Sequence, residues 1–297
     1  MDIHKRCVTV ALSVFNGEAF IEKAVCSIAS QSHPEFDLYI VDDGSEDNTS
    51  EKVFPLVRAD SRIHLVRLKK NIGTYASKNL VLRNYCDGEY FAHQDADDYS
   101  WPERLERQIS FLNSHPEIPA CGTGIDEFFE SADYAPRTPS DCEIKFDEFD
   151  RCYHRSNLYP ALLEKGNYYC QSLENLSQIK IAMNGSIVFR VAVLKSLGGY
   201  DGATHVAGDT ELLWRILSRY DFVNLPEILY SRRFHESSLT QSRVLGFESE
   251  IRYNYIKGVQ KRLRGLNKAM GENDQELADK LVTHDYYYPE VDYELYD

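Results

Sequence analysis

Short apolar runs alternate with helix-like segments over roughly the first hundred residues, and this alternation constrains the fold more than any other feature. Strands that follow one another with a helix between each pair form a doubly wound, mostly parallel central sheet flanked by helices, which is an α/β fold. In such sheets ligands bind at the carboxyl ends of the strands. The predicted strands are residues 7–14, 36–41, 62–66 and 89–93, and the predicted helices are residues 18–31, 48–57, 75–85 and 102–112.

The pattern weakens in the second half of the chain. Residues 131–180 are rich in Tyr, Asp and Asn without a regular period, so they are either an irregular insertion that shapes a second binding site or a poorly ordered excursion. Regular patterns resume at residues 185–189 and in a helix-like segment at 210–219. We therefore predict a main domain over residues 1–243.

Residues 244–297 form a predicted C-terminal extension. A helix is expected over about residues 245–266, and the end, residues 284–297, is acidic and Tyr-rich with no Lys or Arg. The helix has three interpretations: packing on the core, pairing with a second subunit, or peripheral contact with a membrane. The tail is either disordered or adds an interface strand. The basic residues of the helix suit an anionic surface, although an ordinary solvated helix face is the favoured interpretation; they are Arg252, Lys257, Lys261, Arg262 and Arg264.

Charge and composition exclude several classes of function. The formal net charge of −14 opposes broad binding to nucleic acid, which requires concentrated positive charge. No apolar run approaches the roughly 18 residues of a membrane span, and the N-terminus lacks the pattern of a signal peptide. The seven cysteines include no C-x-x-C pair, so we expect reduced thiols, no zinc site, and a cytoplasmic protein.

Two acidic clusters follow predicted strands. Asp42 and Asp43 precede Gly44 after the second strand, and they have a simple alternative interpretation as a turn before a capped helix. The second cluster, residues 95–98, places three carboxylates within four positions after the fourth strand. Such carboxylates repel one another unless a cation relieves them, and hard oxygen ligands suit Mg²⁺ or Mn²⁺. An Asp-x-Asp motif alone is nevertheless a weak indication.

Several motifs occur together in one order and spacing. They are Leu12-Ser-Val-Phe-Asn-Gly-Glu18, Ser27-Ile-Ala-Ser-Gln-Ser32, Val41-Asp-Asp-Gly-Ser-Glu-Asp47, Asn71-Ile-Gly73 with Ser77-Lys-Asn79, and Asp95-Ala-Asp-Asp98. With them the chain resembles the family 2 glycosyltransferases, which have the GT-A fold, over about residues 7–240. The resemblance implies a nucleotide-binding half at residues 1–98 and an acceptor-side half at 99–243.

The resemblance implies a nucleotide site at the ends of the first, second and fourth strands. Asp43 would bond to the base, with Asp42 as a less certain contact, and Lys78 stands where the family often has an arginine. Lys supplies the charge but not the planar fork of that arginine. Asp95 would contact the ribose or a metal-bound water. The implied nucleotide-binding residues are Ser13, Phe15, Glu18, Asp42, Asp43, Lys78, Asp95 and Ala96.

The resemblance also implies a metal site and a catalytic base. Asp97 would bind Mn²⁺ or Mg²⁺ with help from His235, while Arg232 and Arg233 would neutralise the diphosphate. A surface position is the competing interpretation for at least one of these arginines and for the histidine. Asp209, at the start of a helix, would be the general base, or only a helix N-cap. The family often has Glu-Asp here, but this chain has Gly208 before Asp209; Glu211 is the fallback base.

The predicted function is therefore metal-dependent, inverting transfer of a hexosyl or N-acetylhexosaminyl group from a nucleoside-diphosphate sugar, UDP by default. The acceptor would be a hydroxyl of a glycan or lipid-linked glycan in cell-surface polysaccharide synthesis, with the protein in the cytoplasm or at the inner face of the membrane. Two alternatives remain: a non-catalytic sugar-nucleotide-binding scaffold protein of the same fold, and a nucleotidyltransferase. The nucleotidyltransferase is disfavoured because the loop after the first strand is neither Gly-rich nor basic.

Overall fold

The structure is a computed structural model that describes seven stretches of the chain. Within the predicted irregular segment, residues 131–180, only residues 161–165 belong to these stretches. No helix in these stretches is both long and apolar enough to cross a membrane. The described residues are 6–129, 161–165, 181–235, 238–239, 242–246, 249–283 and 289–297.

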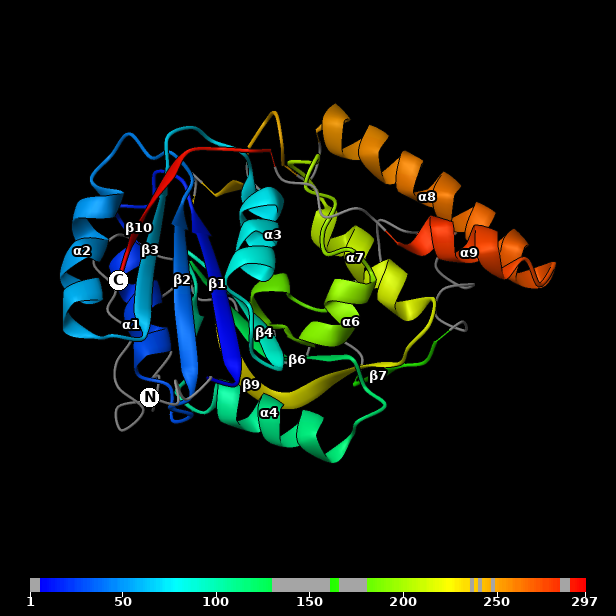
Figure 1. Cartoon of the computed structure of the whole chain (residues 1–297), viewed down its shortest axis with the longest axis horizontal. Coiled ribbons are helices and arrows are strands. Elements are labelled where there is room, and N and C mark those ends of the chain that lie inside the picture. The colour runs from blue at the N-terminus through cyan, green and yellow to red at the C-terminus, as the bar shows by residue number, and fades with distance from the viewer. Residues whose placement is uncertain are drawn as a thin grey trace.

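Four parallel strands form the centre of one sheet, as the alternation predicted (Figure 1). Their order is β3-β2-β1-β4, so the chain moves outward from β1 and then returns to its other side. This reversal is the topological switch point at which doubly wound sheets bind ligands. The four strands are β1 (Val8–Val14), β2 (Phe36–Asp42), β3 (Ile63–Leu68) and β4 (Tyr90–Asp95).

The whole sheet is mixed, because strands other than the four predicted ones extend it on both sides. Beyond β4, strand β8 pairs antiparallel with both β4 and β6. Strands β6 and β9 pair in parallel, with a register shift near Gly124. On the other side, β10 pairs antiparallel with β3. The added strands are β5 (Tyr99–Ser100), β6 (Ala120–Phe129), β7 (Leu162–Leu163), β8 (Val188–Arg190), β9 (Phe222–Phe234) and β10 (Tyr293–Tyr296).

Helices cover both faces of the sheet, because alternate residues of each central strand point to opposite sides. In β1, Val10 and Leu12 enter one apolar core with α1, α2 and α4, while Ala11 enters a second core with α3, α6 and α7. Both faces are therefore dry, which explains why these strands are almost continuously apolar. The helices are α1 (Ile21–Ala29), α2 (Thr49–Ala59), α3 (Thr74–Asn84), α4 (Arg104–Ser114), α6 (Val191–Ser196) and α7 (Gly208–Leu217), with a short 3-10 helix, η4 (Asn184–Ser186).

The C-terminal extension packs on the main body. Helix α8 (Glu250–Gly271) forms a hairpin with α9 (Gln275–Val282), and their apolar residues join the same core as α7. The last described segment is the edge strand β10, so the Tyr-rich tail supplies a strand to the protein's own sheet. A strand is thus observed in the tail, but it pairs with β3 of the same chain, whereas the alternative expected from the sequence was an interface strand.

Candidate active site

The two acidic clusters meet at one edge of the sheet. Ser13 and Asp95 are register partners across β1 and β4, and Val14 faces Asp42 across β1 and β2. Because these strands are parallel, their carboxyl ends and the loops that follow lie together at the switch point. The sequence prediction that both clusters belong to one site is thus consistent with the topology.

The loops after β1 and β2 are tied to each other by hydrogen bonds. The amide of Gly17 donates to the Thr49 hydroxyl (2.9 Å), and the Glu18 carboxylate accepts from the side chain of Asn48 (2.8 Å). Asp42 is buried, and it accepts bonds from the Ser45 amide (2.8 Å) and the Ser50 hydroxyl. Glu18 and Asp42 therefore hold the loops in shape, and this supports the turn interpretation for Asp42.

Phe15 and Asp43 present different surfaces at this edge. Phe15 is an apolar side chain that is 50% exposed directly after β1, and a flat exposed ring can stack on a base. Asp43 is buried and accepts bonds from the amides of Ile72 (2.7 Å) and Gly73 (2.9 Å). Burial raises the pKa of Asp43 to about 6, although these amide bonds favour its charged form. Asp43 thus links the end of β2 to the start of α3.

Helix α3 connects the Asp95 cluster to Asp209. The ammonium group of buried Lys78 lies 3.8 Å from the Asp95 carboxylate. One turn earlier on the same helix, the Tyr75 hydroxyl donates to the Asp209 carboxylate at 3.0 Å. Burial raises the pKa of Asp95 and the nearby Lys78 opposes this rise, while the charges of Asp97 and Asp209 add to it. The three carboxylates therefore face one region.

Tyr75 explains where the chain departs from the family pattern. A Cβ atom at Gly208 would lie 2.9 Å from ring carbons of Tyr75, so a glutamate at that position cannot coexist with the ring in this place. The tyrosine hydroxyl instead contacts Asp209, which lies half-buried in the first turn of α7. No side-chain cap bond is made at the start of this helix, so Asp209 does not act as a simple N-cap.

Asp97 and His235 lie together, although 138 positions separate them in the chain. The His235 Nε2 atom is 2.8 Å from the Asp97 carboxylate, and both side chains are partly exposed. The His235 ring also packs on Phe20, with ring centroids 4.5 Å apart. The acidic motif and the histidine at the end of β9 are therefore in direct contact, while their role as metal ligands stays a prediction.

The two neighbouring arginines have different environments because side chains alternate along β9. Arg233 is buried; its Nε donates to the Asp97 carbonyl oxygen (2.6 Å), and its guanidinium lies over Phe20. Arg232 is only partly buried, and its charge opposes the rise that burial causes in the pKa of Asp95. Arg232 is thus the better candidate for a diphosphate contact, whereas Arg233 holds the acidic loop.

Several residues that sequence analysis missed support the acidic loop. Asp98 is buried and accepts from the Tyr230 hydroxyl (2.9 Å) and the Arg233 amide (2.8 Å). Burial raises the pKa of Asp98 well above its ordinary value. Gln94 donates to the carbonyl oxygens of Asp95 and Asp98, both at 3.0 Å. The alternation of β9, which places Tyr230 and Arg232 on one side, is the only local pattern that points to Tyr230.

Glu211 does not belong to the open part of the site. Its carboxylate is fully buried and binds the Arg215 guanidinium (2.8 and 2.9 Å) as well as Arg262 from α8. Both oxygens are engaged in these ion pairs, so Glu211 is not available as the fallback base. Its role in this structure is to join α7 to α8.

We expect Glu211→Ala to lower the free energy of unfolding by about 3–5 kcal/mol, because it leaves the buried charge of Arg215 without its partner. Urea unfolding followed by circular dichroism measures this change. Glu276→Ala is the control, since Glu276 is exposed on α9 and its loss should change stability by no more than about 0.5 kcal/mol. Equal effects of the two substitutions would refute a stabilising role for the α7–α8 ion pairs.

The donors at Asp97 and His235 fit a hard divalent cation. A carboxylate oxygen and an imidazole nitrogen face each other, and the second carboxylate of the motif, Asp95, lies beside them. Among the described residues no group of three or more His, Cys, Asp or Glu side chains could hold a metal alone. This arrangement matches the habit of Mg²⁺, which takes one or two carboxylates and completes its shell with substrate phosphates and water.

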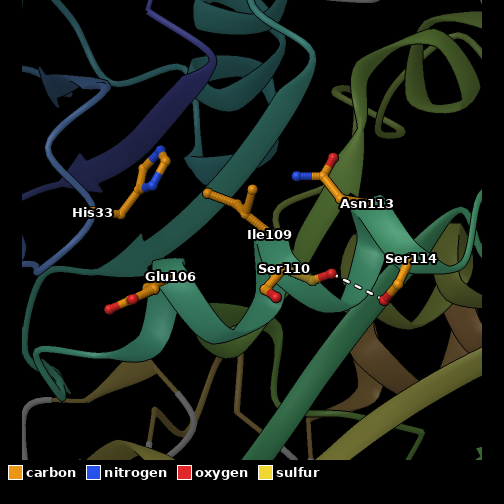
Figure 2. Close-up of a pocket in the computed structure, with 6 residues that line it drawn as sticks. All are labelled: His33, Glu106, Ile109, Ser110, Asn113 and Ser114. Carbon is orange, nitrogen blue, oxygen red and sulfur yellow. Dashed lines mark hydrogen bonds between the residues drawn. The ribbon is translucent and has the colours of Figure 1, made fainter.

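A separate pocket of about 490 Å³ opens along α4 (Figure 2). His33 precedes β2, and Asn113 accepts a bond from the hydroxyl of Tyr90 at the start of β4 (2.6 Å), so the pocket lies at the amino ends of the parallel strands. It is therefore at the opposite edge of the sheet from the acidic clusters. Its lining residues, none of which belongs to the predicted site, are His33, Glu106, Ile109, Ser110, Asn113 and Ser114.

Comparison with known families gives a match to glycosyl transferase family 2 over residues 9–198, which is more than half of the chain. The chain belongs to this family. The resemblance drawn from the sequence motifs is thereby confirmed, and the family match includes the acidic clusters and α3. It ends before Asp209 and His235, whose roles stay predictions.

Relatives of this chain are named as glycosyltransferases. The chain is 30% identical over 235 residues to EpsE of Bacillus subtilis, which is named as a putative glycosyltransferase, and the match covers 76% of this chain and 72% of EpsE. It is 36% identical over 136 residues to TuaG of the same organism, named as a teichuronic acid biosynthesis glycosyltransferase. That match covers 43% of this chain and 54% of TuaG.

Solved structures share the fold. TarS 1-349 of S. aureus, in complex with UDP-GlcNAc, has a TM-score of 0.56 at 19% identity, covering 78% of this chain and 59% of TarS. The mannosyltransferase PcManGT of Pyrobaculum calidifontis, in complex with GDP-Man and Mn²⁺, has a TM-score of 0.52 at 19% identity, covering 80% and 59%. This chain therefore spans less than two thirds of TuaG and of both solved chains. The likeness confirms the predicted GT-A-type architecture.

Proposed function

We propose that this family member is a metal-dependent, inverting glycosyltransferase that uses a nucleoside-diphosphate sugar. The observation that carries the proposal is the contact between Asp97 and His235 at the carboxyl ends of the strands, in the same region as Asp95 and Asp209. The acceptor we propose is a hydroxyl of a glycan or lipid-linked glycan. Cell-surface polysaccharide synthesis is the proposed process, since TuaG is named for such a pathway.

The donor would lie along the edge formed by β1, β2 and β4. Phe15 would stack on the base, Asp43 would accept from it with its remaining lone pairs, and Asp95 would face the ribose. We propose UDP as the first nucleotide to test because TarS is found with UDP and UDP-GlcNAc, and GDP as the second because PcManGT is found with GDP-Man. The cytoplasm is the proposed compartment.

The proposed reaction breaks the bond between the anomeric carbon and the diphosphate oxygen and forms a bond from that carbon to the acceptor oxygen. Asp209 accepts the proton of the attacking hydroxyl, and Tyr75 holds the carboxylate in place. Arg232 pairs with the negative charge on the departing diphosphate. A divalent ion held by Asp97 and His235 would supply further neutralisation of that charge. Attack from the face opposite the leaving group inverts the anomeric centre.

Nucleotide binding is testable without knowledge of the acceptor. We expect one nucleoside diphosphate, at 100 times its Kd and with Mn²⁺ present, to stabilise the protein by about 2.7 kcal/mol. This corresponds to a rise in Tm of roughly 5–10 °C, which differential scanning fluorimetry measures. Phe15→Ala should abolish most of the rise. The matched control is Leu162→Ala, because Leu162 is also an exposed apolar side chain, at 54% against 50% for Phe15, and belongs to β7.

Two results would contradict the proposal. The first is the absence of a shift with every nucleotide at saturating concentration. The second is release of pyrophosphate from a nucleoside triphosphate supplied with a sugar phosphate, without release of a nucleoside diphosphate from the nucleotide sugar, because that product belongs to nucleotidyl transfer. A shift that survives Phe15→Ala unchanged would remove the base contact from the proposal.

A further inference from the structure

Helix α8 has one face in the core and one face in solvent. Val259, Leu263 and Leu266 are buried against the rest of the C-terminal core. Figure 1 shows α8 along the outside of the molecule, next to α9. The solvent face is therefore a surface feature of the whole protein and does not depend on an opening of the fold.

The solvent face of α8 carries a row of basic residues, which we name the basic stripe: Lys257, Lys261, Arg264 and Lys268. They are four, three and four positions apart, which places them on one side of the helix, and all are exposed. Lys268 lies 3.9 Å from the Glu272 carboxylate. Within the described part of the chain, no carboxylate forms an ion pair with the other three.

The stripe differs from the basic set predicted from sequence. Arg262 points inward to buried Glu211, and Arg252 is half-buried, with a charge that acts on Tyr75. These two arginines therefore belong to the packing between α8 and the active-site side of the protein. The residues that remain for an external partner form a continuous row of positive charge on a chain whose formal net charge is −14.

An exposed aromatic ring accompanies the stripe. Tyr253 is 58% exposed, one turn before Lys257, and the Lys257 ammonium lies 4.2 Å from the centre of its ring. A soluble polyanion would require only the charges, whereas a lipid headgroup region also accommodates an aromatic ring at its depth.

We propose that the basic stripe docks on an anionic lipid surface. Clusters of four or more Lys and Arg on a helix bind anionic membranes through attraction that adds up with each charge and weakens with salt. The attraction between the stripe and the lipid surface has to overcome the repulsion between that anionic surface and the rest of this acidic protein. The association should therefore be reversible and sensitive to ionic strength. On the neighbouring helix α9, the Asp279 carboxylate is paired with Arg219 and not with a residue of the stripe.

The position of α8 gives this docking a consequence for the site. The Tyr255 hydroxyl donates to the Asp201 carboxylate (2.8 Å), and Arg252 acts electrostatically on Tyr75, which contacts Asp209. The first turns of α8 thus lie beside the proposed acceptor side, and a docked protein would hold that side near the lipid surface. This last step rests on the proposed function, whereas lipid binding itself does not.

Vesicle sedimentation of the full chain tests the proposal without donor or acceptor. We expect the protein to sediment with vesicles of 30% phosphatidylglycerol in phosphatidylcholine at low salt, to remain in solution with pure phosphatidylcholine, and to be released at about 0.5 M NaCl, where the Debye length is only several ångströms. Replacing Lys257, Lys261 and Arg264 by glutamine should reduce the partition coefficient roughly tenfold or more. The matched control replaces three exposed basic residues on other elements, Lys52, Arg58 and Arg107, by glutamine, and should retain binding.

The outcomes separate the alternatives. Loss of binding in the α8 variant but not in the control, with equal thermal stability of the two, supports the proposal. No sedimentation of the unmodified protein overturns it, and so does equal binding by both variants. If the unmodified protein ignores vesicles but elutes from heparin at higher salt than the α8 variant, the stripe serves a soluble polyanion and the lipid proposal is wrong. None of these results depends on whether the nucleotide tests succeed.

Discussion

Asp97→Asn is expected to reduce sugar transfer by roughly 100- to 1000-fold, which corresponds to about 3–4 kcal/mol of transition-state stabilisation. The side chain keeps its shape but loses the charge that, with His235 at 2.8 Å, makes the proposed cation site. The departing diphosphate would then lack part of its neutralisation. Steady-state kinetics over a range of Mn²⁺ concentrations measures the effect, and the concentration required for half-maximal activity should rise as well.

Two further aspartates make this prediction specific. Asp87→Asn removes an exposed carboxylate and should leave both activity and metal dependence unchanged. Asp98→Asn changes the neighbour of Asp97, whose carboxyl is buried against Tyr230 and Arg233. It should alter stability while the dependence on Mn²⁺ stays as in the unmodified protein. Full activity of Asp97→Asn at limiting Mn²⁺ would exclude Asp97 as a metal ligand.

The predicted elements of the first half were found because their patterns are local. The four central strands each end within two residues of the expected position, since continuous apolar runs between helices leave little choice of register or face. β9 escaped prediction because Pro226 and several polar residues interrupt its pattern, and its pairing with β6 joins segments about a hundred residues apart. Pairing between such distant segments produces no pattern within about ten consecutive residues of the sequence.

The same distinction applies to the site. Asp43, Lys78 and Asp97 follow from motifs that sit at strand ends or at a helix start, so their region could be predicted. The burial of Glu211 could not, because it depends on Arg215 one turn later and on Arg262 from α8. Tyr75 was also missed, since its importance arises from the space that Gly208 leaves for its ring. A carboxylate's role depends on its surroundings, and those come from distant parts of the chain.

Asp209→Asn should lower kcat by roughly 100- to 10,000-fold, the range that a general base contributes, because an amide cannot accept the proton of the acceptor hydroxyl. Asp209 is half-buried, and its carboxylate holds a bond from Tyr75, so an isosteric replacement should preserve the start of α7. Initial rates at saturating donor and acceptor measure kcat. Glu227→Gln, at an exposed position of β9, is the control and should leave kcat unchanged.

Donor binding distinguishes loss of the base from loss of the fold. Asp209 contacts Tyr75 of α3, whereas the Asp95 carboxylate of the proposed donor site lies near Lys78 of the same helix. Asp209→Asn should therefore retain the thermal shift caused by the nucleotide. Tyr75→Phe keeps the ring that fills the space beside Gly208 but removes its hydroxyl, so a smaller decrease in kcat, roughly tenfold, is expected with an unchanged KM for the donor. Undiminished kcat in Asp209→Asn would exclude this residue as the base. Since Glu211 is buried in ion pairs, the search would then turn to Asp95, whose carboxylate lies 3.8 Å from Lys78 of α3.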